Sequence, residues 1–234
     1  MPKENPPDSP EPVSWPNPSS AAGPPHRGGP TERTGAGSPP QPPQRSEQFP
    51  PDGETEYERS VIRIPFHLKG AAPGANRKVD VMVFDAYMRL IRHAPVTNGL
   101  GFRQFEFTIA DWELTHTFSP GLNANVTFTL SDTVQPRSIC IASHRERDYP
   151  ALIVYSAIYD VYLGTTRIVE KQPGVAYATP VWEIPPRNVT VAFEKPFESD
   201  QFSFSAGTCE AMRSISREEF EAGVAVARAA RGQS

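Results

Sequence analysis

The sequence predicts a mainly β protein, either an antiparallel β-sandwich of jelly-roll type or a barrel, with about eight or nine strands and one C-terminal α-helix. Short segments alternate between apolar and polar residues and are separated by turn residues, which is typical of half-buried antiparallel strands. No strand–helix–strand alternation occurs, so a parallel sheet is not expected. The concentration of proline at the N-terminus predicts a disordered tail in front of this domain.

The composition of the N-terminal segment differs from that of the rest of the chain. Sixteen of the 27 prolines lie in the first 52 residues, where Val13, Trp15 and Phe49 are the only large apolar side chains after Met1. Such a segment buries too little apolar surface to offset the entropy lost when it becomes ordered. We therefore expect disorder there, with extended polyproline stretches.

This break in composition divides the chain into three parts. We expect a disordered Pro/Gly/Ser-rich tail at 1–55, a single antiparallel β domain at 56–212 and a docked amphipathic helix at 213–232. Within the tail, Pro40–Arg45 matches the P-x-x-P-x-R pattern that SH3-type grooves bind. Because such a match arises easily in a proline-rich segment, a linker is the preferred interpretation.

The first two segments of the β domain carry a period of two. Over 61–69, four apolar residues share one face: Ile62, Ile64, Phe66 and Leu68. The segment 79–91 fits a strand through its alternating apolar residues, although Val83, Tyr87 and Ile91 also fit a helical stripe. The β-rich surroundings favour the strand.

The later segments supply the remaining strands. In 103–115 the apolar face slips by one residue near Ala110–Asp111, which predicts a β-bulge. Residues 151–163 are apolar on both sides, which predicts a central strand covered on both faces, and the Gly164-Thr165 turn after it predicts a hairpin. Pro196 is expected to end one of the later strands. Further strands are expected at 126–131, 139–141, 166–169, 175–184, 188–194 and 201–205.

The C-terminal segment has the features of a helix. Ser216 followed by Glu219 forms a capping box, which marks a helix start. Three apolar residues then line one face: Phe220, Val224 and Ala227. Gly223 weakens the helix interior by about 1 kcal/mol relative to alanine, so we expect the helix to need docking against the domain.

Charge and cysteine content restrict the class of protein. The formal net charge is −4, and neither the tail nor the domain has the basic excess expected for binding nucleic acid. The start of the chain has no apolar signal segment, and no apolar stretch is long enough to span a membrane. We therefore expect a soluble cytoplasmic protein without membrane or nucleic-acid partners. Cys140 and Cys209 are expected to be reduced thiols.

Two groups of residues resemble reactive sites but have simpler interpretations. Asp111 and Glu113 form a carboxylate pair near His116, as glycoside hydrolysis requires. On a regular strand both carboxylates point away from Trp112, so we interpret the group as a core tryptophan beneath a solvated face. Cys140 and His144 have metal-ligand spacing without the second cluster that a zinc site needs. They are interpreted as a buried thiol and a loop histidine.

Two further groups could line a binding site. Tyr155 and Tyr159 share one strand face and Tyr162 the other, so the three tyrosines do not line one pocket, and a core role is favoured. Arg145 and Arg147 alternate with Glu146 and Asp148 in the sequence, which makes a locally neutral and solvated turn more plausible than an anion site.

These observations favour a non-catalytic β-sandwich module that binds a protein partner. We predict no catalytic residues, no metal site and no cofactor, and the sequence specifies neither the binding residues nor the oligomeric state. The first alternative is a barrel that binds a small molecule, or an enzyme built on one, with Trp112, Trp182 and Tyr159 as candidate pocket aromatics. The second alternative is a structural subunit of an assembly. A cavity above roughly 300 Å³ with convergent polar groups would favour the small-molecule alternative.

Overall fold

The computed structural model describes residues 47–69 and 79–232. Most of the proline-rich tail, including the Pro40–Arg45 motif, lies outside the described residues. The described chain forms ten strands and one helix. In order they are β1 (Thr55–Leu68), β2 (Val79–Arg92), β3 (Val96–Thr97), β4 (Arg103–Ser119), β5 (Ala124–Leu130), β6 (Arg137–Ala142), β7 (Ala151–Leu163), β8 (Thr166–Val181), β9 (Val189–Glu198), β10 (Phe202–Ser214) and α1 (Arg217–Gly232).

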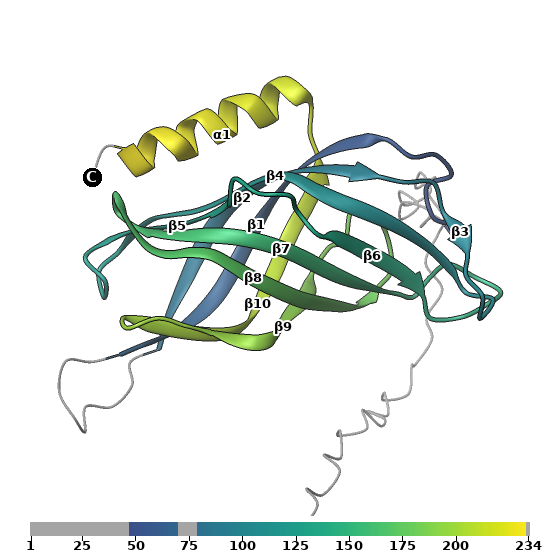
Figure 1. Cartoon of the computed structure of the whole chain (residues 1–234), viewed down its shortest axis with the longest axis horizontal. Coiled ribbons are helices and arrows are strands. Elements are labelled where there is room, and N and C mark those ends of the chain that lie inside the picture. The colour runs from purple at the N-terminus through teal and green to yellow at the C-terminus, as the bar shows by residue number, and fades with distance from the viewer. Residues whose placement is uncertain (1–46, 70–78, 233–234) are drawn as a thin grey trace, which may run out of the picture. The chain divides into compact units, whose positions relative to one another are not determined.

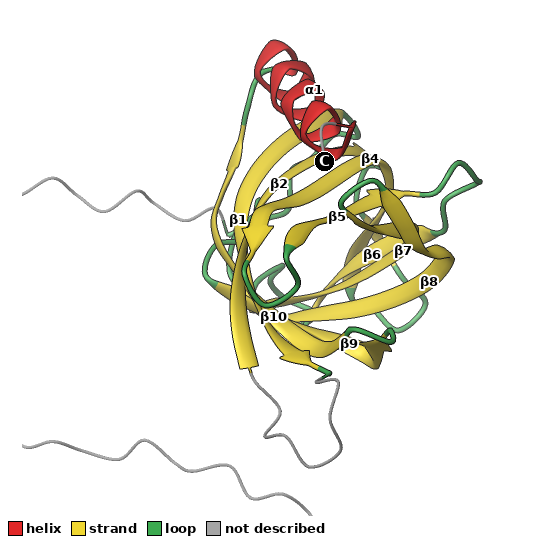
Figure 2. Ribbon diagram, turned by 90° about the vertical axis from the view of Figure 1, so that its left-hand side faces the viewer, coloured by secondary structure: helices red, strands yellow, loops and turns green. Residues whose placement is uncertain are grey.

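The strands close into an antiparallel barrel, which decides between the two predicted architectures. Successive neighbours run β2-β1-β10-β9-β8-β7-β5-β4, and the pairing of β2 with β4 closes the ring. β5 and β6 share one position, because both pair with β4 on one side and with β7 on the other. Figures 1 and 2 show the strands curving around a common interior. Closure leaves no unpaired sheet edge between β2 and β4 over their shared length.

The N-terminal half of the barrel follows the predicted alternation. The predicted inward face of β1 is confirmed by the burial of Ile64, Phe66 and Leu68, and Ile62 is partly buried. The segment 79–91 is confirmed as a strand: Met82, Phe84, Ala86, Met88 and Leu90 all point inward. The bulge in β4 is also confirmed, because Arg89 pairs with Asp111 while the adjacent Leu90 pairs with Ile109.

The C-terminal strands are longer than predicted. The predicted segment 166–169 and most of 175–184 belong to one strand, β8, which ends at Val181 and forms the expected hairpin with β7. Pro196 does not end β9, because it lies where the pairing with β10 is irregular and no ladder donor is required of it. β10 continues to Ser214, although its inward positions beyond Phe204 are small or widely spaced. For this reason the apolar alternation in the sequence did not predict the second half of β10.

The helix α1 begins as the capping box predicts, since the backbone N–H of Glu219 donates to Ser216 Oγ at 3.2 Å. The predicted face of Phe220, Val224 and Ala227 is buried. The helix lies outside the barrel against β1, β2 and β4 (Figure 2). Gly223 has a packing role there, because a Cβ atom on it would stand 2.1 Å from Cε1 of Tyr87. Among residues 47–69 and 79–232, no helix is long and apolar enough to cross a membrane.

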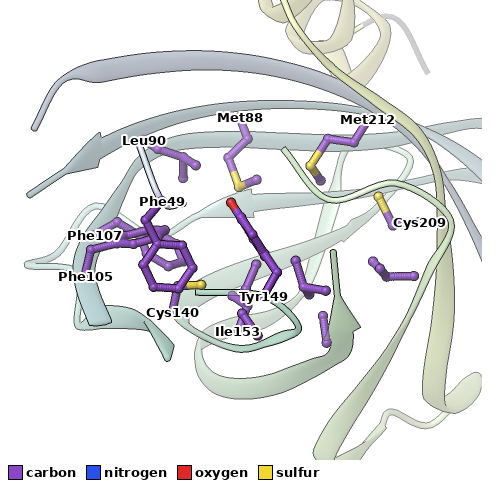
Figure 3. Packing of buried hydrophobic residues seen from close by; sticks show 14 of the residues in the cluster. Phe49, Met88, Leu90, Phe105, Phe107, Cys140, Tyr149, Ile153, Cys209 and Met212 are labelled. Atoms are coloured by element: carbon purple, nitrogen blue, oxygen red, sulfur yellow. The ribbon is translucent and has the colours of Figure 1, made fainter. Parts of the chain in front are cut away.

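The interior contains two apolar clusters. The first includes Phe49, which lies in the segment that the composition assigned to the tail but is only 2% exposed. Its ring packs edge-on against Phe105 and Tyr149, with ring centroids 5.1 and 5.2 Å away (Figure 3). The second cluster is built on stacked phenylalanines from β1, β9 and β10, among them Phe66, Phe197 and Phe204. The folded part of the chain therefore includes residues upstream of β1.

Candidate functional site

A cavity of about 120 Å³ lies inside the barrel between the two apolar clusters. Every position of the barrel contributes to its lining, from β1, β2, β4, β5, β7, β8, β9 and β10. Members of the first cluster such as Met88 and Met212 lie on one side, and members of the second such as Phe128 and Phe204 on the other. Figure 3 shows the thioether sulfurs of Met88 and Met212 in the first cluster.

The cavity exists because the middle of the barrel carries short side chains. Five lining residues have no side chain beyond Cβ: Ala86, Ala157, Gly174, Ala176 and Gly207. A ring of large residues at these positions would fill the interior of a barrel of eight strands. Tyr155 and Ala157 are only partly buried although they point inward, because part of their surface lines the cavity. A cavity of this size accommodates a group about as large as a benzene ring.

Among the described residues of the lining, Glu58 is the only acidic one, and none is basic. It continues the inward face of β1 and is 3% exposed. No described residue donates a hydrogen bond to its carboxyl group. Burial raises the pKa of Glu58 from its ordinary 4.5 to about 8, and the nearby negative charge of Glu56 adds to the rise. Glu58 therefore holds its proton at neutral pH.

Neutral polar groups surround this carboxyl. Ser60, Tyr155 and Cys209 also line the cavity, and a hydrogen bond links the Ser60 hydroxyl to the Cys209 thiol. Burial raises the pKa of Cys209 to about 11, while that bond opposes the rise. Burial, followed by the charge of Glu58, raises the pKa of Tyr155 well above its ordinary value. All three groups are uncharged at neutral pH. Figure 3 shows the Cys209 sulfur among the residues of the first cluster.

An aromatic wall forms another part of the lining. The rings of Trp112 and Tyr159 meet edge to face, with centroids 6.0 Å apart. Gly174 allows Tyr159 its position, because a Cβ atom on this glycine would stand 2.7 Å from Cε1 of the tyrosine. Burial raises the pKa of Tyr159 to about 12. The wall therefore presents neutral aromatic surface to the cavity.

A second cavity of about 20 Å³ shares Glu58 and Tyr155 with the first. Its lining includes Arg92, whose guanidinium is almost fully buried. Arg92 is already engaged: Nη2 donates to Glu54 Oε1 and Nε to Glu56 Oε1, both at 2.9 Å. Nη1 also donates to the carbonyl oxygens of residues 50 and 52. Arg92 therefore ties the segment before β1 to β2 and does not neutralise Glu58.

The predicted carboxylate pair lies on the outside of the barrel. Asp111 and Glu113 do point away from Trp112, as expected, but Glu113 is fully buried and does not face water. Arg228 of α1 covers it, with Nε donating to Glu113 Oε1 at 2.9 Å and Nη2 to Asp111 Oδ1 at 3.0 Å. His116 lies on the opposite strand face, with Nδ1 2.6 Å from the Val83 carbonyl oxygen. These groups dock the helix and do not form one site.

Among the candidate pocket aromatics, Trp112 and Tyr159 line the cavity, whereas Trp182 is 47% exposed and does not. Tyr155 joins Tyr159 in the lining and Tyr162 does not, in agreement with their predicted faces. Glu58 and Ser60, which also line the cavity, were not predicted from the sequence. The alternation of β1, extended backwards from Ile62, identifies both as inward-pointing.

The remaining candidates are dispersed. Cys140 is a buried free thiol and His144 is exposed, as interpreted. Arg145 and Arg147 are exposed, but Asp148 is not part of a solvated turn: it is 2% exposed and accepts a hydrogen bond from the Phe49 backbone N–H at 2.6 Å. Within the described residues, no three His, Cys, Asp or Glu side chains gather as a metal site would require.

The comparisons with known proteins show a likeness of fold. No protein-family model matches the chain, and no curated protein matches it in sequence. A solved structure, that of DynF from the dynemicin biosynthesis pathway of Micromonospora chersina, is similar, with a TM-score of 0.53 and 12% sequence identity. The match covers 78% of this chain and 95% of DynF. At this identity the likeness concerns the fold alone.

Proposed function

We propose that this protein binds a small, largely apolar molecule inside its β-barrel. The observation that carries the proposal is the central cavity, which combines apolar walls with one buried and unpaired carboxyl group. A buried polar group without a partner costs stability, and such groups concentrate at functional sites. The likeness to a protein of a biosynthesis pathway, where binding small molecules is an expected task, supports the same function.

The volume limits what the cavity holds. At about 120 Å³ it is smaller than the roughly 300 Å³ set as the criterion for a pocket of drug size. A ligand the size of one small ring or a branched four-carbon group fits without rearrangement. A larger molecule requires the flexible side chains of Met88 and Met212 to move. The polar residues at one end, Glu58, Ser60 and Tyr155, would orient the bound molecule.

Tryptophan fluorescence tests the proposal directly. The chain has three tryptophans, so substituting Trp15 and Trp182 with phenylalanine leaves Trp112 in the cavity wall as the single reporter. We expect benzene to change its emission saturably. The Ala176→Leu variant fills the cavity and should abolish the saturable change. A response that is absent, or identical in the two proteins, would contradict the proposal.

A second candidate function is the binding of a protein partner. The outer face of β2 exposes a row of apolar side chains, Val79, Val81 and Val83, which are 50%, 56% and 38% exposed. Exposed apolar rows of this kind occur at protein interfaces. This function predicts that Val81→Glu weakens a protein–protein association, measured by affinity capture, while ligand binding in the cavity is unchanged.

A further inference from the structure

We propose that the cavity selects a small ammonium ion, whose apolar body occupies the aromatic space and whose positive charge lies against the Glu58 carboxylate. This inference rests on the proposed ligand-binding function and specifies the chemical class of the ligand. It follows from the charges in and around the cavity, from the aromatic walls and from the missing partner of Glu58.

The charges exclude an anionic ligand. Among the residues that the structure describes, the lining contains no lysine, arginine or histidine, and Glu58 is its only carboxylic acid. The charge of Glu56, which is next to it on the inward face of β1, adds negative potential at Glu58. A carboxylate or phosphate placed here would lie unpaired beside a second carboxyl group. Burying such a charge without a partner is strongly unfavourable in an apolar site.

A cation meets the opposite situation. No described cation pairs with Glu58, because Arg92 on β2 is fully engaged by Glu54, Glu56 and backbone carbonyls. The other titratable groups that face Glu58, Tyr155 on β7 and Cys209 on β10, are neutral at physiological pH. An ammonium ion therefore supplies the one opposite charge that the site lacks. Ionised Glu58 and the cation then compensate each other's desolvation.

The walls favour the same ligand. The faces of aromatic rings attract cations, tryptophan most strongly and tyrosine next. Trp112, Tyr155 and Tyr159 all line the space into which Glu58 points. A carboxyl group combined with aromatic walls matches an alkylammonium ion better than a neutral hydrocarbon, which would leave Glu58 unpaired.

Two probes with the same carbon skeleton separate charge from shape: tert-butylammonium and tert-butanol. Both are compact enough for a cavity of about 120 Å³. Affinities are measured for the full chain by titration with NMR detection. We expect the ammonium ion to bind at least tenfold more tightly than the alcohol at pH 8. Equal binding, or tighter binding of the alcohol, would overturn the ammonium assignment while leaving the ligand-binding function intact. If neither probe binds, both proposals fail.

The pH dependence supplies an independent readout. An alkylammonium ion stays protonated to about pH 10, as lysine does, so of the two paired groups only Glu58 titrates between pH 6 and 8. Because the cation requires ionised Glu58, its affinity should rise about tenfold per pH unit in this range, and binding should release close to one proton. Calorimetry in buffers of different ionisation enthalpy measures this release. A flat pH profile without proton release would contradict the pairing with Glu58.

A matched pair of variants locates the effect. Glu58→Gln keeps the shape of the side chain but not its charge, and should remove the preference for the ammonium ion. Glu210→Gln makes the same change on β10 outside the cavity, where Glu210 pairs with Arg63 at 2.9 Å, and should keep the preference. Loss of the preference in both variants would show that general charge, and not the cavity, attracts the cation.

Discussion

Replacing Glu58 with glutamine should make the protein more stable at neutral pH. Glutamine has the shape of the protonated acid but does not ionise. In the folded parent, burial holds the pKa of Glu58 at about 8, against 4.5 for the exposed side chain. At pH 7 the unfolded chain therefore gains stability by releasing a proton that the folded protein keeps. Two and a half pH units at about 1.4 kcal/mol each give a cost of about 3 kcal/mol.

The sign of the effect fixes its pH window. The folded state binds the Glu58 proton more tightly than the unfolded state, so the parent loses stability as the pH rises from about 4.5 to about 8. Above pH 8 the loss levels off at about 5 kcal/mol. Glu58→Gln removes this dependence, so the two proteins should be equally stable near pH 4.5 and diverge above it.

Urea unfolding at several pH values measures the difference, with circular dichroism as the signal. A control is Glu210→Gln, which removes a carboxylate from an exposed ion pair and should change the free energy of unfolding by less than about 1 kcal/mol. If Glu58→Gln is no more stable than the parent at pH 7, or if the gap is constant between pH 5 and 9, Glu58 is not a protonated, unpaired acid in the folded state.

Four further substitutions test the packing, each by urea unfolding. Ala176→Leu places its new atoms in the cavity and should stabilise the protein by about 1 kcal/mol. Ala178→Leu lies two residues along the same strand but outside the lining, and should destabilise the protein by about 2 kcal/mol. Equal effects of the two substitutions would argue against the cavity. Gly223→Ala should destabilise despite the better helix propensity of alanine, because its Cβ would meet Tyr87 at 2.1 Å, and a gain in stability would refute this contact. Arg228→Met should cost about 2 kcal/mol, because it removes the guanidinium that donates to the buried Glu113 carboxylate. An unchanged midpoint would show that α1 docks without this pair.

The sequence predicted the regular parts of the barrel because local alternation determines them. The inward faces of β1 and β2 repeat large apolar residues at every second position, and the slip at Ala110–Asp111 revealed the bulge in β4. Closure was not predictable, because it depends on the pairing of β2 with β4, which no local pattern reports. The choice between sandwich and barrel therefore required the structure.

The candidate site was hidden for a physical reason. A ligand cavity requires small residues where a core pattern has large ones, as at Gly207 in β10, so the alternation fades where the site lies. Glu58 also interrupts the alternation of apolar and polar residues in β1, because a charged residue at an inward position suggests that the strand has ended. Trp112 and Tyr159 were predicted as pocket aromatics because large aromatic residues stand out in a sequence. The same prediction for Trp182 was wrong, because its exposure depends on the tertiary fold.

The most direct test of the account is to locate a bound ligand. Intermolecular NOEs from the methyl protons of tert-butylammonium identify the protons of the protein that lie beside it. The account predicts NOEs to the Trp112 indole and the Tyr159 ring inside the barrel, and their loss in Ala176→Leu. NOEs confined to exposed side chains, such as Val81 on the outer face of β2, would contradict it.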